Sequence, residues 1–138
     1  MPAFDKYYNA VKHALERDGW TITAENTSLV FGGVRMFIDI RAESLLIAER
    51  DTRKIAVEVK SFLEHSTLSA FQDAVGQYLS YLVALESEEP DRTLYLAAPQ
   101  VIWEPFSKLP FTQAIAARVN LRVLVFDPIS EEVVQWIE

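Results

Sequence analysis

The first stretch of the chain has the apolar spacing of an amphipathic helix. Tyr8, Val11 and Leu15 follow one another at intervals of three and four residues, which places them on one helical face. This spacing predicts a helix over residues 5–17, and Asp18-Gly19 supplies its end. A short β-prone segment, Trp20–Thr23, comes next, and residues 26–28 have the composition of a loop.

The pattern changes to strand-length runs between residues 34 and 60. Three β-prone runs follow one another there, separated by short polar segments: Met36–Ile40, Ser44–Glu49 and Lys54–Lys60. Connections this short suit strands that are antiparallel neighbours. Residues 34–60 are therefore predicted to form an antiparallel meander.

Helical spacing returns in the second half of the chain. It extends over Leu68–Glu86, where Ser66 or Ser69 is available as the N-cap and Pro90 closes the segment. The continuous apolar runs at residues 93–98 and 121–126 indicate strands that are buried on both faces of a sheet. The second half is therefore expected to alternate helices with buried strands.

Two weaker elements complete the prediction. Residues 100–118 have helical character that Pro105 and Pro110 should break into pieces. Glu132–Ile137 is expected to form an edge strand, and its apolar side chains make it a candidate interaction edge, unless Trp136 simply packs back on the core. The predicted order α-β-β-β-α-β-α-β indicates an α/β fold with a mixed central β-sheet flanked by helices.

Composition favours one ordered domain spanning residues 1–138. The chain has 138 residues and is 50% hydrophobic, which is enough for one sizeable core but too little for two ordinary domains. Its beginning is polar and no apolar run is long enough to span a bilayer, so a cytoplasmic location is expected. The chain has no cysteine, so a metal ion would have to be held mainly by oxygen ligands.

The charge balance limits how this protein can meet DNA. It has 20 acidic and 13 basic residues, giving a formal net charge of -7. Non-specific DNA affinity depends on neutralising phosphates with Lys and Arg. A DNA-directed function therefore requires a partner's basic surface or a local cluster of cations.

Strand periodicity isolates a charged pair in the run Lys54–Lys60. Alternation sends Ile55, Val57 and Val59 to one face of the strand and Glu58 and Lys60 to the other. Charged groups on the face of an otherwise apolar strand are unfavourable to bury unless they are paired, solvated or bound to a metal. An exposed surface ion pair is the alternative explanation.

Asp39 repeats the anomaly in the first of the three β-prone runs, Met36–Ile40. Asp39 followed by Glu58-Val59-Lys60 resembles the signature of PD-(D/E)XK nucleases, and the order of elements resembles their restriction endonuclease-like core. Phosphodiester hydrolysis in such a site uses a divalent cation to polarise the phosphoryl oxygen and activate a water molecule. Asp39 and Glu58 would supply hard oxygen ligands for Mg²⁺ or Mn²⁺, and Lys60 would orient the water and stabilise the developing charge.

The following helix adds two candidates. Gln77 and Tyr81 are four residues apart, hence on one helical face, and resemble the Gln-x-x-x-Tyr element of RecB-like members of that superfamily. Ordinary core packing of Tyr81 is the alternative. Many enzymes with this fold also carry an acidic residue on the first helix, for which Glu16 is the candidate metal ligand and a solvated helix surface is the alternative; Glu43 and Glu49 are its rivals.

A closer resemblance covers nearly the whole chain. It is carried by Tyr8–Lys12, Asp18–Ile22, Lys54–Phe62, Gly76–Tyr78, Arg92–Ala97, Val125–Pro128 and Val134–Ile137. In these segments the chain resembles the XisH family, the fdxN element excision controlling factors. The resemblance implies a role in programmed DNA excision in heterocyst-forming cyanobacteria, together with the small companion protein XisI. It does not imply nuclease activity, because a separate recombinase family cuts and joins that element.

Two hypotheses follow from different classes. The first is a metal-dependent, endonuclease-like protein that acts on DNA with Asp39, Glu58 and Lys60. The second is a catalytically inactive regulatory subunit that uses the same fold to bind XisI or DNA. The intact acidic and basic residues favour the first hypothesis, whereas the net charge favours the second; self-association is also open.

Overall fold

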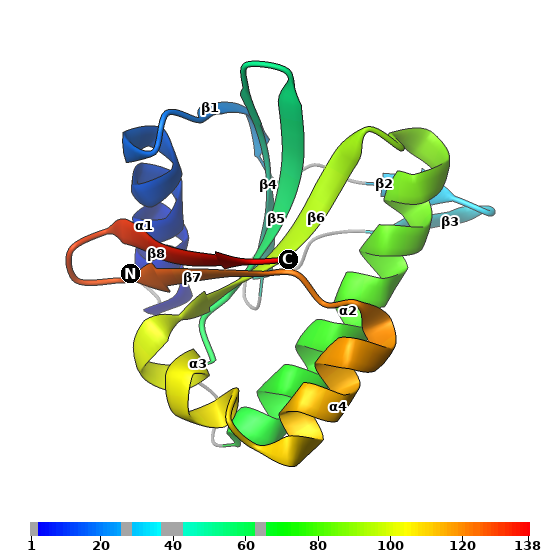
Figure 1. The fold of residues 1–138 in the computed structure, drawn as a ribbon. Helices are drawn as coiled ribbons and strands as arrows, with labels where there is room; N and C mark the ends of the chain where they lie inside the picture. The colour runs from blue at the N-terminus through cyan, green and yellow to red at the C-terminus, as the bar shows by residue number, and fades with distance from the viewer. Residues whose placement is uncertain (1–2, 26–28, 37–42, 63–65) are drawn as a thin grey trace.

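A six-stranded mixed sheet forms the centre of the molecule (Figure 1). The computed structural model describes residues 3–25, 29–36, 43–62 and 66–138. In spatial order the strands are β1 (Thr21–Glu25), β4 (Glu43–Arg50), β5 (Arg53–Lys60), β6 (Arg92–Pro99), β7 (Val123–Asp127) and β8 (Glu132–Ile137). β5, β6 and β7 run parallel and the other neighbours are antiparallel, so the predicted mixed sheet flanked by helices is confirmed.

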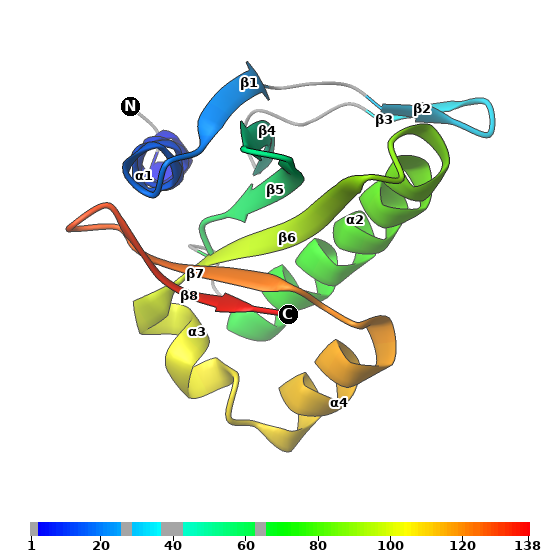
Figure 2. The same cartoon turned by 45° about the horizontal axis from the view of Figure 1, so that its top comes forward.

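Helices cover both faces of this sheet (Figure 2). α1 (Ala3–Arg17) packs on one face, where Val11 and Leu15 join a buried apolar cluster. The other face is covered by α2 (Thr67–Glu88), α3 (Gln100–Phe106) and α4 (Pro110–Val119). Two apolar cores therefore sandwich the sheet, one under α1 and one under α2.

The predicted central strands are buried on both faces. Along β6, Leu94 and Leu96 join the core under α2, whereas Tyr95 and Ala97 join the core under α1. Because successive side chains point to opposite faces, a strand covered on both sides needs apolar residues at every position. The continuous apolar composition of this run reflects that environment.

The ends of the helices follow their local chemistry. Ser66 caps α2, because its side-chain oxygen accepts a hydrogen bond of 3.1 Å from the Ser69 backbone N–H. Of the two prolines expected to break residues 100–118, Pro110 does so, because it occupies the first turn of the new helix α4. Pro105 lies inside α3 and does not end it there. Asn120, with φ of 52°, ends α4 in the left-handed conformation that Asn tolerates well.

Where residues before β4 are described, the structure differs from the predicted meander. β4 and β5 pair antiparallel as expected, but β1 lies along the other side of β4 from Leu46 to Glu49. Val34–Met36 instead forms β3, which pairs with β2 (Leu29–Phe31) in a separate hairpin. Gly32 and Gly33 both have positive φ, so their backbone closes a tight turn that favours this local pairing. The rest of the predicted strand, residues 37–40, lies outside the described residues.

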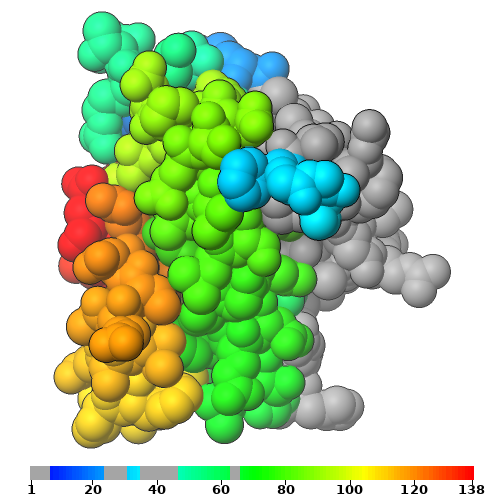
Figure 3. Space-filling view, turned by 90° about the vertical axis from the view of Figure 1, so that its right-hand side faces the viewer, coloured from blue at the N-terminus to red at the C-terminus, as the bar shows by residue number. Residues whose placement is uncertain are grey.

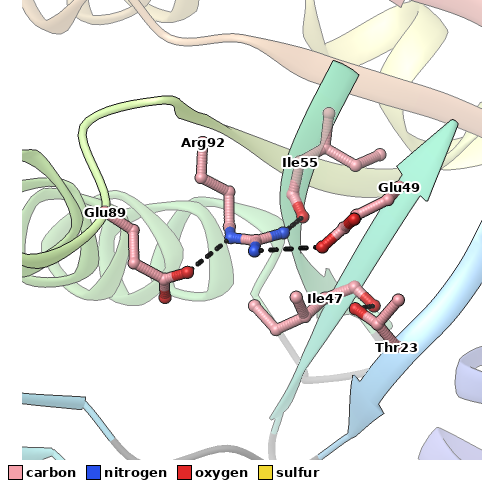
Figure 4. Close-up of polar contacts among 6 residues, drawn as sticks. All are labelled: Thr23, Ile47, Glu49, Ile55, Glu89 and Arg92. Carbon is pink, nitrogen blue, oxygen red and sulfur yellow. Dashed lines mark hydrogen bonds and ion pairs between the residues drawn. The ribbon is translucent and has the colours of Figure 1, made fainter. Parts of the chain in front are cut away.

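A buried guanidinium group joins the start of β6 to its neighbours (Figure 4). The Arg92 Nε donates to the Glu89 Oε1 at 3.0 Å, and its Nη1 donates to the Ile55 carbonyl oxygen at 3.1 Å. The Arg92 Nη2 lies 3.5 Å from the Glu49 Oε2, while only 7% of the Arg92 side chain is exposed. The Arg92 side chain thus links the segment between α2 and β6 to strands β4 and β5.

Trp136, on the edge strand β8, packs against other aromatic side chains. Trp136 lies against Tyr95 and Trp20, with ring centroids 4.9 and 5.8 Å away. It therefore packs back toward the core under α1, as the packing alternative supposed. None of the described helices has the length and apolar character needed to cross a membrane.

Candidate functional site

Glu58 and Lys60 are buried in the middle of the sheet. Glu58 is 0% exposed and Lys60 is 2% exposed. Glu58 stands in register with Leu45 on β4 and Leu96 on β6, so β5 is covered on both sides by neighbouring strands. Within the described segments, Thr112 is the other fully buried polar residue. The ion pair on a solvated surface strand is therefore not what this structure contains.

Both charged residues lie on the face that α2 covers. Ala56, two positions before Glu58, belongs to the apolar core under α2, whereas Ile55 and Val57 belong to the core under α1. Strand alternation carries the Ala56 side forward to Glu58 and Lys60. The division of faces predicted from the sequence is confirmed for this strand.

On α2, the negative charge of Glu58 affects the pKa of Tyr78. Burial raises the pKa of the Tyr78 hydroxyl, the Arg122 backbone N–H and positive charge oppose this rise, and the negative charge of Glu58 adds to it. The hydroxyl donates to the Leu94 carbonyl oxygen and accepts from the Arg122 backbone N–H, each at 3.3 Å. The sequence placed Tyr78 in the predicted helix and in the XisH-like segment Gly76–Tyr78, but no local pattern reveals its contacts with distant strands.

Gln77 and Tyr81 both lie on the sheet side of α2. Gln77 is half-buried, and its buried Oε1 has no hydrogen-bond partner among the described residues. An amide oxygen in that condition can accept a hydrogen bond or coordinate a cation. Tyr81 is 4% exposed and belongs to the core under α2, which agrees with a packing role.

The predicted acidic ligands do not all come together. Asp39 lies outside the described residues, so its position relative to Glu58 stays a prediction. Glu16 is exposed on α1, on the opposite face of the sheet from Glu58. It also lies near the other end of β5, because Gly19, which follows α1, approaches the Arg50 side chain at the β4–β5 turn. The structure therefore does not bring Glu16 to Glu58.

The two rivals of Glu16 fall at opposite ends of β4. Glu43 stands in register with Lys60, at the end of the strand pair that carries the candidate site. Glu49 stands in register with Lys54 and forms its ion pair with Arg92 instead. Of these two acidic residues, Glu43 is the one that the strand register places beside the candidate site.

Comparison with known proteins identifies the family of this chain. A family model described as XisH protein matches residues 1–134. The chain belongs to the XisH family. No curated protein matches the chain.

Two solved structures share the XisH fold almost end to end. A crystal structure of an XisH family protein from Nostoc punctiforme PCC 73102 is 40% identical, with a TM-score of 0.89 over 97% of this chain and 100% of that one. A crystal structure of an fdxN element excision controlling factor protein from Anabaena variabilis is 41% identical, with a TM-score of 0.89 over 97% of this chain and 99% of that one. These two proteins therefore share the arrangement of sheet and helices found in this chain.

The described residues of this XisH chain supply one of the two carboxylates predicted to bind a hard cation. Within residues 3–25, 29–36, 43–62 and 66–138, no three His, Cys, Asp or Glu residues gather as a metal-binding group. Mg²⁺ is often held by one or two carboxylates and several waters, which is a smaller demand. Glu58 supplies one carboxylate on a buried strand, and the predicted second, Asp39, lies outside the described residues.

Proposed function

We propose that this XisH chain is an excision controlling factor whose chemical centre is a PD-(D/E)XK-type site for phosphodiester hydrolysis on DNA. The observation that carries the proposal is the burial of Glu58 and Lys60, 0% and 2% exposed, on one face of a central strand. The mixed sheet and the position of α2 directly after β5 support a restriction endonuclease-like core. The place of action is the cytoplasm, where such DNA lies.

The energetics of burial give this observation its weight. Removing a carboxylate and an ammonium group from water costs several kcal/mol for each ion, even after the protein relaxes around them. Apolar residues of similar size would fill the same positions on β5 at no such penalty. Charged groups retained where they oppose stability are typical of a functional site.

Each residue has a defined role in the proposed reaction. Glu58 and Asp39 would hold Mg²⁺ or Mn²⁺, which when bound polarises the phosphoryl oxygen and lowers the pKa of an attacking water. Lys60 would orient that water and stabilise the charge that develops on the phosphate. Gln77 would hold the water or a phosphate oxygen through its amide, and Tyr81 would support Gln77 from the next helical turn.

The acidic composition favours a second candidate function. With 20 acidic and 13 basic residues, the chain as a whole repels phosphates at long range. A nuclease-fold regulatory subunit that acts by binding XisI, or that meets DNA only together with XisI, fits this charge. The two candidates differ in whether Glu58 must bind a cation.

Cation binding and plasmid cleavage, measured with and without XisI, test the proposal. We expect Mn²⁺ to bind the wild-type chain in calorimetry and the cation to support cleavage. Glu58→Gln should weaken Mn²⁺ binding at least tenfold, roughly the loss seen when a metal site is disturbed, and abolish cleavage. Glu104→Gln, on the exposed side of α3, is the control and should change neither.

The outcomes separate the candidates. Mn²⁺ binding that is unaffected by Glu58→Gln would contradict the metal site. A chain that binds no Mn²⁺, cleaves nothing with XisI present and yet forms a stable complex with XisI would instead support the regulatory subunit.

A further inference from the structure

The outward side of α2 carries an uncharged, largely apolar stripe. Its members recur at helical intervals, and we call them the outer stripe: Leu68, Gln72, Val75, Gly76, Leu79 and Val83. Val75 is half-buried at the edge of the core under α2, and the other five are exposed. Leu68, Leu79 and Val83 are 44%, 39% and 50% exposed. Figure 3 shows α2 at the surface of the molecule, between α4 and the β2–β3 hairpin. None of the six residues is charged, although 24% of the chain is.

Gly76 at the middle of this stripe has no explanation within the described chain. It is exposed, its φ is not positive, and a Cβ built there meets no described atom within 4 Å. Glycine is less favourable than alanine in a helix interior, because it loses more backbone entropy on folding. A glycine does allow another backbone to come close. The open space at Gly76 therefore suits a second helix packed against α2.

The charges at the two ends of α2 indicate the direction of that second helix. Glu86 and Glu88 lie in the last turn, which has no basic residue, while the first turn has no acidic residue. Carboxylates beside a helix C-terminus are unfavourable, and beside a helix N-terminus they are favourable. An antiparallel neighbour would bring its N-terminal turn to these carboxylates. The charges therefore favour an antiparallel partner helix whose first turn, like that of α2, has no acidic residue of its own.

We propose that the outer stripe is the contact of a homodimer, with α2 packed antiparallel against α2 of a second copy. A two-fold axis between Val75 and Gly76 pairs every member of the stripe with another member. Leu68 then faces Val83 of the second copy, and Gln72 faces Leu79. Val75 faces Gly76, whose missing side chain leaves room for it. A two-fold contact requires this self-complementarity.

The surroundings of α2 suit a second copy. The net charge of -7 opposes self-association in general, but the stripe itself brings no like charges together. The β2–β3 hairpin packs against α2, and its Phe31 and Val34 are 38% and 58% exposed. A stable interface needs more area than a single pair of helices buries, and this hairpin has exposed apolar side chains to add to it.

The mass of the protein in solution is the first test. At tens of micromolar, light scattering should give about twice the 15.7 kDa of the chain, and sedimentation should resolve a concentration-dependent dimer. Leu79→Asp should weaken the dimer by about tenfold or more, since it buries a charge in the middle of the contact. Ile129→Asp is the matched control, because Ile129 is 93% exposed on the β7–β8 turn. A monomer mass, or an equal effect of both variants, overturns the proposal.

Gly76→Gln separates the dimer contact from folding. Glutamine is a better helix former than glycine and its Cβ has open space in the single chain, so thermal stability measured on dilute monomer should rise or stay unchanged. The same side chain would occupy the space that Val75 of the second copy needs, so the dimer should be lost. A Gly76→Gln protein that dimerises as well as wild type contradicts the proposal.

Single cysteines locate the axis. The chain has no cysteine, so each variant has one thiol. Under mild oxidation Val75→Cys should form a disulfide-linked dimer, because the two copies of position 75 lie beside the axis. Ser87→Cys, at the far end of α2, should stay unlinked. Equal cross-linking at both positions would show random collision and would overturn the proposed geometry.

Discussion

At the scale of single residues, the same kind of side chain behaves differently according to where the sheet places it. Tyr78 and Tyr95 are both fully buried, but on opposite faces. Burial raises the pKa of both hydroxyls, and at Tyr95 the hydrogen bond to the Glu138 carboxylate raises it further. Tyr78 donates to a backbone carbonyl oxygen instead, and the more distant charge of Glu58 acts on it.

The pKa of Tyr95 makes stability depend on pH in the alkaline range. Burial and the Glu138 contact raise this pKa from 10.0 to about 12. The folded state therefore keeps its proton where the unfolded state loses it. The resulting stabilisation is fully present below pH 10 and disappears as the pH rises toward 12.

Denaturant unfolding across this pH range, with absorbance titration of the phenolates, measures the effect. Wild type should lose on the order of 2 kcal/mol more than Tyr95→Phe over this interval. Glu138→Gln should shift the late phenolate titration to lower pH. Tyr95→Phe should remove one phenolate from the late titration and leave that of Tyr78, whose pKa is also raised. A late titration of unchanged amplitude in Tyr95→Phe would contradict the assignment.

At the scale of secondary-structure elements, buried polar contacts decide how β4, β5 and β6 are held together. The Arg92 side chain reaches Glu89, Glu49 and the Ile55 carbonyl oxygen with almost no exposure to water. Charge-assisted hydrogen bonds in a partly buried setting are stronger than surface ion pairs. This contact fixes the start of parallel strand β6 beside β5, and with it the register of the strand that carries Glu58.

Arg92→Met tests the importance of that contact. Methionine keeps the apolar stem but leaves the Ile55 carbonyl oxygen and two carboxylates without their donor. We expect the free energy of unfolding in urea to fall by about 2 kcal/mol, with an unchanged denaturant dependence.

The matched control is Arg118→Met, at the exposed end of α4, which should change stability by less than about 0.5 kcal/mol. An equal effect of the two variants would mean that the Arg92 contacts contribute no more than surface charge does.

At the scale of the whole molecule, net charge limits the DNA contact that the proposed function requires. The 20 acidic residues outnumber the 13 basic residues, so few phosphates can be neutralised by one chain. Under the proposed function, DNA binding would therefore need cations from a partner or from a small part of the surface.

We expect the single chain to bind duplex DNA weakly at physiological salt, with a shallow dependence of the binding constant on salt concentration. Fluorescence anisotropy over a salt series measures both quantities, and each neutralised phosphate adds about 0.9 to the slope on logarithmic axes. Adding XisI should steepen the slope if XisI supplies the basic surface. Tight binding with a steep slope by the chain alone would contradict the expectation.

Local pattern was enough to predict much of this protein. The periodicity of residues 5–17 and 68–86 predicted α1 and α2, because the face of a helix that packs on a core must repeat every three or four residues. Alternation along residues 54–60 predicted the common face of Glu58 and Lys60, because successive side chains of a strand point to opposite sides. These properties belong to short segments, so the sequence by itself determined them.

Tertiary structure alone decided which segments meet. The sequence did not reveal that β1 would take the place beside β4, since many β-prone segments can pair and only the assembled core selects among them. It also left open whether Glu58 and Lys60 were exposed, because burial depends on α2 and on two neighbouring strands. Glu16 was the metal-ligand candidate suggested by the resemblance to PD-(D/E)XK nucleases, but the position of α1 on the opposite face separates it from Glu58. Contacts between distant segments depend on the packing of the whole chain, which no local pattern contains.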